Sequence, residues 1–269
     1  MNIAFIGCGN MASAIAIELS NYSKLSSFEL NIFTYTPSVN KAKDLAEEVG
    51  GTFVENLKSF EDYDINYWVL GFKPQQLHDF HKENQSFLKG ANIVSMLAGT
   101  SVSRLSSLFG SENIIRIMPN TPIKVGKGTT LVYDHPKCKK DFKDHLRQHF
   151  KSSGIIECKS ERDLDILTTF SGCGPAYIFL FADTLMKKMS ELGYEDSISR
   201  QLINTLFEGA SSLMSSSEEK LTTLLDQVTS KGGVTIEAIN TYRDSDIYDS
   251  TSSAIEAAIK KSDELNQVT

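Results

Sequence analysis

A glycine-rich segment near the start of the chain has the spacing of a phosphate-binding turn. Gly7-Cys8-Gly9-Asn10-Met11-Ala12 follows a run that predicts a strand and precedes a helical pattern. In this setting the first glycine permits a tight turn, the second lets the backbone approach a pyrophosphate, and the small third residue allows close helix–strand packing. The free N–H groups at the helix start favour phosphate. The segment predicts a dinucleotide site, with an ordinary glycine-rich turn as the alternative.

The residues after the second predicted strand indicate which dinucleotide binds. Enzymes that use NAD usually place an acidic residue here, which holds the ribose 2′-hydroxyl. This chain has Thr36, Ser38 and Lys41, so hydroxyl groups and a cation are available for a 2′-phosphate. We therefore expect NADP(H) to be the preferred cofactor, with NAD(H) possible. The same residues would also cap the next helix, and the two roles are compatible.

Two stiff segments follow later predicted strands, at the edge where ligands bind in open α/β sheets. One is Gly71-Phe72-Lys73-Pro74, and the other is Met118-Pro119-Asn120-Thr121-Pro122. The two prolines of the second segment fix the backbone around Asn120. We expect Asn120 to contact the substrate; the alternative for each segment is a stiff connecting loop.

The segment Ser230-Lys231-Gly232-Gly233-Val234-Thr235 lies between two predicted helices. Such a turn directs several backbone N–H groups to one point, which suits a carboxylate. Thr235 falls in the first turn of the next helix, so helix capping is its alternative role. Oxidation of an alcohol normally needs a general base, and these motifs contain no histidine and no cysteine with a paired base. The pattern favours hydride transfer to a C=N bond, in which positioning supplies most of the rate.

Short β-rich runs alternate with helical stretches over the first 160 residues. This alternation is typical of a parallel sheet with helices on its faces. The expected strands are Asn2–Ile6, Leu30–Tyr35, Thr52–Val54, Tyr67–Leu70, Asn92–Leu97, Ile114–Met118, Thr130–Tyr133 and Ile155–Cys158. The predicted fold is α/β, with a Rossmann-type doubly wound parallel sheet over residues 1–160 and an all-helical domain over 161–269.

From Glu161 onward the strand signal ends, and apolar residues recur at helical spacing. Ser217 is expected to cap one of these helices. The segment Ala176–Leu192 is apolar on nearly every side, so a helix there must be buried on several sides. A helical domain of this size has difficulty covering such a helix alone. An intertwined homodimer is therefore expected.

Composition argues against several classes of partner. Lys and Arg total 27 against 34 Asp and Glu, so the net charge is −7 and there is no electrostatic footprint for nucleic acid or an anionic membrane. No apolar run reaches the roughly 18 residues of a membrane span. The 4 cysteines and 5 histidines form no metal-ligand pattern, so no metal is expected. Separated cysteines favour a reducing compartment, and the cytoplasm is the expected location.

Six segments together resemble those of the pyrroline-5-carboxylate reductases. In chain order they are Phe5–Ala12, Lys73–Gln75, Ala98–Gly99, Met118–Pro122, Ser171–Tyr177 and Asp226–Thr235. The resemblance implies NAD(P)H-dependent reduction of a small-molecule substrate, 1-pyrroline-5-carboxylate, to L-proline in the last step of proline biosynthesis. It also implies a dimer formed through the helical domain, often assembled further into a decamer. The alternatives are another NADP-dependent reductase of the same two-domain plan and a non-catalytic dinucleotide sensor.

The resemblance also implies individual site residues. Thr235 corresponds to the hydroxyl that hydrogen-bonds the ring nitrogen. The residues implied in substrate binding are Ser230, Gly232, Gly233 and Val234, with Glu218 as a weaker candidate. The residues implied in cofactor binding are Gly7, Cys8, Gly9, Asn10, Met11, Ala12, Thr36, Ser38, Asn56, Gly71, Phe72, Lys73, Pro74 and Ala98. Lys231 stands where the family usually has proline, a departure that could shift substrate affinity.

Overall fold

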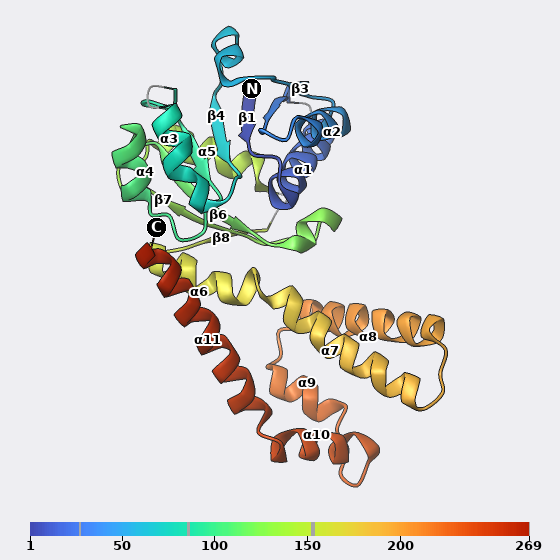
Figure 1. Cartoon of the computed structure of the whole chain (residues 1–269). Helices are drawn as coiled ribbons and strands as arrows, with labels where there is room; N and C mark the ends of the chain where they lie inside the picture. Colours follow the sequence, from blue (N-terminus) through green and yellow to red (C-terminus); the bar gives the residue numbers. More distant parts are fainter. Residues whose placement is uncertain (27, 85–86, 152–153, 269) are drawn as a thin grey trace. The chain divides into compact units, whose positions relative to one another are not determined.

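The computed structural model describes residues 1–26, 28–84, 87–151 and 154–268. The chain forms two compact units. One contains Met1–Pro175 and the C-terminal residues from Ala258, and the other contains Ala176–Ala257. All the strands of the described residues lie in the first unit, which is called here the sheet unit, and the second is called the helical unit (Figure 1).

The sheet unit is built on one 8-stranded sheet with the order β3-β2-β1-β4-β5-β6-β7-β8. The strands are β1 (Asn2–Ile6), β2 (Asn31–Tyr35), β3 (Thr52–Phe53), β4 (Tyr67–Leu70), β5 (Ile93–Ser95), β6 (Ile114–Pro119), β7 (Thr130–Asp134) and β8 (Ile155–Glu157). All the expected strands are present. The predicted α/β fold with a doubly wound sheet is therefore confirmed.

One strand departs from the parallel arrangement that the alternation predicts. β7 runs antiparallel to β6, with Arg116 opposite Tyr133 and Pro119 opposite Thr130. Only the short 3₁₀ helix η3 (Thr121–Val125) joins these strands, whereas a parallel pair needs a crossover of about a dozen residues or more. The predicted parallel sheet therefore contains one antiparallel pair, β6 and β7.

Residues of β1 alternate between two hydrophobic clusters, one on each face of the sheet. Ile3 and Phe5 belong to the cluster that includes residues of α1, α2 and α5, whereas Ala4 and Ile6 belong to the cluster that includes residues of α3 and α4. All four side chains are buried, as expected for a strand with both faces covered. The helices and 3₁₀ helices between the strands, apart from η3, are α1 (Asn10–Ser26), α2 (Val39–Val49), η1 (Leu57–Asp62), η2 (Pro74–Gln76), α3 (Leu77–Glu83), α4 (Val102–Phe109) and α5 (Lys140–His149).

Helices follow the last strand. They are α6 (Glu161–Ser171), α7 (Gly174–Glu191), α8 (Asp196–Ser216), α9 (Leu221–Gln227), α10 (Val234–Asp244) and α11 (Ile247–Val268). Ser217 does not begin a helix as expected: it ends α8, and Lys220 is the residue that precedes α9. Its hydroxyl accepts a hydrogen bond from the Glu219 N–H at 3.1 Å, which closes a short turn between the two helices.

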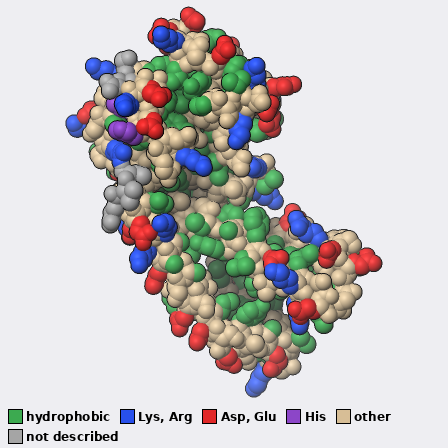
Figure 2. Space-filling model, viewed as in Figure 1, with side chains coloured by type: hydrophobic (Ala, Val, Ile, Leu, Met, Phe, Trp, Pro, Cys, Tyr) green, Lys and Arg blue, Asp and Glu red, His purple; other side chains and the backbone are tan. Residues whose placement is uncertain are grey.

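The helical unit leaves much apolar surface exposed in the single chain. Phe179 and Leu180 of α7 are 67% and 68% exposed, and Leu206 of α8 is 52% exposed. Figure 2 shows hydrophobic side chains gathered over this unit. Large exposed apolar patches usually mark an interaction surface. The combined stretch Glu161–Glu191 also has the length and hydropathy of a membrane span. The length of uninterrupted apolar runs in the sequence did not predict this. A helix packed inside an oligomer has the same composition.

Candidate active site

A cleft of about 490 Å³ lies where the chain leaves the carboxyl ends of β1, β2, β4, β5 and β6. Ligands bind at this edge in open α/β sheets. All the residues expected to contact the cofactor line the cleft, except Ala12 and Asn56. Further lining residues are Lys41, Gln76, Met96, Met118 and Pro119. Each of the last three lies at or directly after the end of a strand, and this position is the signal that would have included them.

Backbone hydrogen bonds hold the glycine-rich turn against its neighbouring strands. The Gly7 N–H donates to the Tyr35 carbonyl at 2.7 Å, and the Gly71 N–H donates to the Ile6 carbonyl at 2.9 Å. Gly7 has a φ of +96°, and a Cβ added there would lie 2.7 Å from the Phe72 nitrogen. Only glycine adopts this conformation in so little space. The turn is thus shaped before any ligand binds.

Ala12 acts behind the cleft and does not line it. It is buried on α1, and a Cβ added at Gly71 would lie 2.6 Å from the Ala12 Cβ. The small side chain therefore lets α1 approach the end of β4, as the motif predicts. Asn56 precedes η1, where its side chain accepts a hydrogen bond from the Ser59 N–H at 3.2 Å. Asn56 is not among the residues that line the cleft.

The end of the cleft at β2 carries hydroxyl groups and a cation. Thr36, Ser38 and Lys41 all line it, and none of the lining residues is acidic. A second cavity of about 220 Å³ shares Gly7, Thr36, Phe72 and Gln76 with the cleft. Its walls include Tyr35 and the Phe72–Phe80 ring pair, with centroids 5.0 Å apart, while Asp79 and Glu83 add negative charge.

The Cys8 thiol is held in its protonated form. Its Sγ lies 3.7 Å from the Tyr35 carbonyl oxygen, and burial raises the pKa of the thiol to about 12. Removal of the thiolate from water is the largest cause of this rise. Cys8 therefore supplies neither a nucleophile nor a base to the cleft.

Asn120 follows β6 and is buried. Its Oδ1 accepts a hydrogen bond from the Thr129 N–H at 2.8 Å, and its Nδ2 donates to the Ser171 carbonyl at 3.1 Å. Both ends of the carboxamide are thus engaged within the sheet unit. A direct contact between Asn120 and the substrate stays a prediction.

The glycine-rich turn of the helical unit joins α9 to α10. The Gly233 N–H donates to the Ser230 carbonyl at 3.0 Å, and Gly232 has a φ of +74°. Gly233 precedes the first residue of α10, so the N–H groups that follow it lie at the positive end of the helix dipole. A Cβ at Gly233 would lie 2.5 Å from the Ser230 Oγ and 3.1 Å from the Ser230 carbonyl oxygen, so the Ser230 hydroxyl would have to rotate away.

Thr235 is in the first turn of α10, and its side chain is exposed. Glu218 is also exposed, in the connection between α8 and α9. The expected substrate residues other than Asn120 therefore belong to the helical unit, whereas the expected cofactor residues belong to the sheet unit. Within the described residues, no three His, Cys, Asp or Glu side chains come together in a way that would hold a metal ion.

Comparison with known proteins gives two family matches, one in each half of the chain. Residues 161–265 match the family described as pyrroline-5-carboxylate reductase dimerisation, and residues 2–99 match the family described as NADP oxidoreductase, coenzyme F420-dependent. The pyrroline-5-carboxylate reductase of Vibrio alginolyticus is 29% identical over 271 residues, which cover 99% of this chain and 98% of that protein. The Staphylococcus haemolyticus enzyme of the same name is 28% identical over 273 residues, with coverage of 99% and 98%.

Solved structures agree with these matches. The Plasmodium falciparum pyrroline carboxylate reductase, crystallised with NADP bound, superposes with a TM-score of 0.86 at 26% identity and covers 99% of this chain and 98% of its own. The Coxiella burnetii pyrroline-5-carboxylate reductase has a TM-score of 0.85 at 27% identity, with 98% of each chain covered. A prephenate dehydrogenase from Aquifex aeolicus, 13% identical with a TM-score of 0.54, shares the fold alone. The chain is thus similar to the pyrroline-5-carboxylate reductases over nearly its whole length, and its residues 161–265 match the dimerisation domain of that family.

Proposed function

We propose that this protein reduces 1-pyrroline-5-carboxylate to L-proline with NADPH, in the last step of proline biosynthesis. The observation that carries the proposal is the presence, in one chain, of a dinucleotide cleft and a separate glycine-rich turn that ends at Thr235. The first provides for the reductant and the second for a small carboxylate. NADH is the alternative cofactor, used less well.

The residues of the cleft fit a dinucleotide. The turn Gly7–Ala12 brings the start of α1 to the pyrophosphate, and Thr36, Ser38 and Lys41 lie where a 2′-phosphate would be neutralised. The adjoining cavity, with the ring of Phe80 in its wall, is suited to a purine. When the dinucleotide is bound in the cleft, its nicotinamide supplies the hydride.

The substrate half of the proposal rests on the helical unit. The N–H groups around Ser230, Gly232, Gly233 and Val234 would bind the carboxylate of the imine. The Thr235 hydroxyl would hydrogen-bond the ring nitrogen, and Glu218 would lie nearby as a weaker contact. The hydride adds to the ring carbon of the C=N bond, and the nitrogen keeps the proton of the iminium form. No general base is needed for this addition, which agrees with the protonated state of Cys8.

The assembly proposed is a homodimer formed through residues 161–269, with residues 1–160 as the cofactor-binding domain. The apolar faces of α7 and α8 are the surfaces that a second copy would cover. Dimers would combine further into a decamer. The cytoplasm is the proposed location, since the four cysteines are free.

The test is the oxidation of NADPH, and separately of NADH, with 1-pyrroline-5-carboxylate supplied. We expect imine-dependent loss of reduced-nicotinamide absorbance, faster with NADPH. Oxidation only with a keto or hydroxy acid substrate would instead identify a different reductase. Tight NADPH binding with no oxidation of any kind would identify a dinucleotide sensor.

A further inference from the structure

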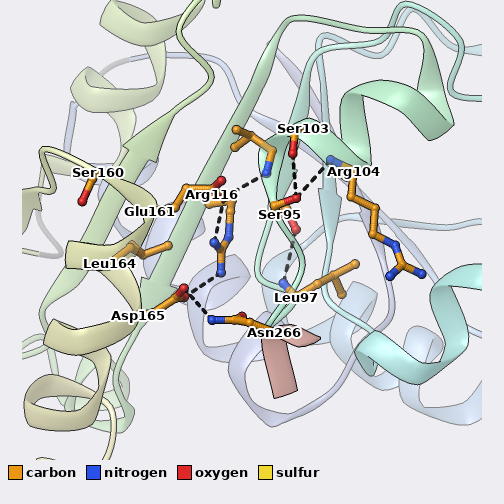
Figure 3. Close-up of polar contacts among 12 residues, drawn as sticks. Ser95, Leu97, Ser103, Arg104, Arg116, Ser160, Glu161, Leu164, Asp165 and Asn266 are labelled. Carbon is orange, nitrogen blue, oxygen red and sulfur yellow. Dashed lines mark hydrogen bonds and ion pairs between the residues drawn. The ribbon is translucent and has the colours of Figure 1, made fainter. Parts of the chain in front are cut away.

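A buried arginine on β6, Arg116, is linked to several helices of the sheet unit. Arg116 is 1% exposed and forms ion pairs with Glu161 at 2.8 Å and with Asp165 at 3.1 Å (Figure 3). Removing a guanidinium from water is costly unless close partners satisfy it. The geometry of the three side chains is therefore tightly constrained, unlike that of exposed ion pairs.

Each of the two acidic partners of Arg116 also accepts a hydrogen bond from another helix. The Asp165 carboxylate accepts a second hydrogen bond from the Asn266 amide of α11 at 2.9 Å, and Glu161 accepts one from the Val102 N–H at the start of α4 at 2.9 Å (Figure 3). An ion pair between Arg162 and Asp263 links α6 to α11 a second time. A single side chain of β6 is thus connected to α4, α6 and α11.

The helices that Arg116 holds lie next to the two places where the chain passes between the units: α6 directly precedes α7, which contains the first crossing, and α11 contains the second. The chain leaves the sheet unit between Pro175 and Ala176, in the first turn of α7, and returns within α11 at Ala258. Asn120, four residues after Arg116 on the same chain segment, holds the far end of α6 through the Ser171 carbonyl. Between them lies Met118, which lines the cofactor cleft. One short segment therefore contributes to the cleft and secures both connections.

We propose that Arg116 is a positioning residue for catalysis: it fixes α6 and α11 to β6 and so anchors, within the sheet unit, the chain segments that lead to and from the unit that carries the substrate turn. The kinetic effects expected from this proposal rest on the proposed function, the reduction of the imine with NADPH. Hydride transfer depends on the placement of the reacting atoms to within a fraction of an ångström, whichever copies of the chain supply them. The Arg116 side chain is not among the residues that line the cofactor cleft. Loss of Arg116 should therefore impair turnover and leave NADPH binding intact.

The first experiment compares R116M and R116K with R147M. Arg147 is a matched control, because it is a partly buried arginine with two acidic partners, Asp134 and Glu157, and neither partner is on α6 or α11. We expect R116M to lose at least about 10-fold in kcat/KM for the imine while its Kd for NADPH changes by less than about twofold. R116K, which keeps the charge, should recover part of the loss. R147M should lower thermal stability and leave kcat/KM unchanged.

A second readout does not depend on activity. Hydrogen exchange of the α11 amides near Asn266 should be faster in R116M than in the unmodified protein, and unaffected in R147M. If R116M fails to fold, N266A removes the hydrogen bond between Asp165 and α11 while the Arg162–Asp263 ion pair remains, and it should also speed exchange of the amides near Asn266. If NADPH affinity falls together with kcat/KM, or if R116M and R147M behave alike, the role is structural and the proposal is wrong. Inactivity of the unmodified protein would contradict the proposed function, and the exchange experiment would still decide the role of Arg116.

Discussion

Gly7 and Phe72 meet backbone to backbone, so closely that a Cβ at Gly7 would lie 2.7 Å from the Phe72 nitrogen. The positive φ of Gly7 adds a second obstacle to any side chain. We expect G7A to be destabilised by about 1–3 kcal/mol and to lose NADPH binding, because the turn must open to accept the methyl group. Thermal denaturation and titration with NADPH measure the two effects.

A substitution at Gly9, in the same turn, tests NADPH binding separately from stability. A Cβ there would meet only the Gly71 carbonyl oxygen, at 3.8 Å, which is an ordinary contact. We expect G9A to keep the stability of the unmodified protein to within about 1 kcal/mol and to bind NADPH at least about 10-fold more weakly, because its methyl group would stand where the pyrophosphate approaches. Unchanged affinity in G9A would show that this turn does not bind the pyrophosphate.

Lys41 is expected to select NADPH over NADH. A charge-assisted hydrogen bond contributes about 1.5–3 kcal/mol, so K41A should raise the KM for NADPH by about 10-fold or more. The KM for NADH should change little, since NADH has no 2′-phosphate. K43A is the matched control, because Lys43 is on the same helix and lies over the Phe53 ring at 5.3 Å, outside the cleft lining. Equal changes for both cofactors would exclude Lys41 as the selective residue.

Thr235 is expected to act through its hydroxyl. T235V removes the hydroxyl and nearly preserves the shape, so kcat should fall by about 10- to 100-fold, the usual effect of one positioned hydrogen bond at a reacting centre. T235S keeps the hydroxyl and should retain most of the activity. Steady-state kinetics of the two variants decide the point, and equal activity in T235V and the unmodified protein would remove Thr235 from the mechanism.

The cysteines should differ sharply in reactivity. Alkylating reagents attack the thiolate, and burial raises the pKa of Cys8 to about 12 and that of Cys138 to about 11. In the native protein at about pH 8, both should therefore resist iodoacetamide, while Cys173, which is exposed in the single chain, should react with it. Labelling of Cys8 and Cys138 should require unfolding or strongly alkaline pH. Mass spectrometry of the labelled peptides tests this, with C173S as the control for the accessible site.

The apolar face of α7 should be needed for assembly. L180E places a charge on a side chain that is 68% exposed in the single chain, so it should shift the protein to monomers and abolish turnover. L25E places the same charge on an exposed leucine of α1 in the sheet unit and should leave the oligomer intact. Sedimentation velocity distinguishes the two. A dimeric L180E variant would show that dimerisation uses another surface.

Local patterns predicted the features that depend on residues close together in the chain. Alternating short strands and helices predicted the doubly wound sheet, and Gly7–Ala12 predicted a turn between β1 and α1. The turn at Ser230 also falls, as expected, before a helix start. Each of these requires only the conformational limits of glycine, the periodicity of apolar residues and the free N–H groups of a helix start.

The sequence by itself thus determined the class of fold, the dinucleotide turn and the resemblance that names the reaction. Only the tertiary structure decided that β7 is antiparallel, that the Asn120 carboxamide is engaged by Thr129 and Ser171, and that Arg116 joins α6 to α11. These features consist of contacts between residues far apart in the chain. Neither spacing nor residue type indicates which of many possible partners a buried polar side chain will meet, because folding of the whole unit determines that choice.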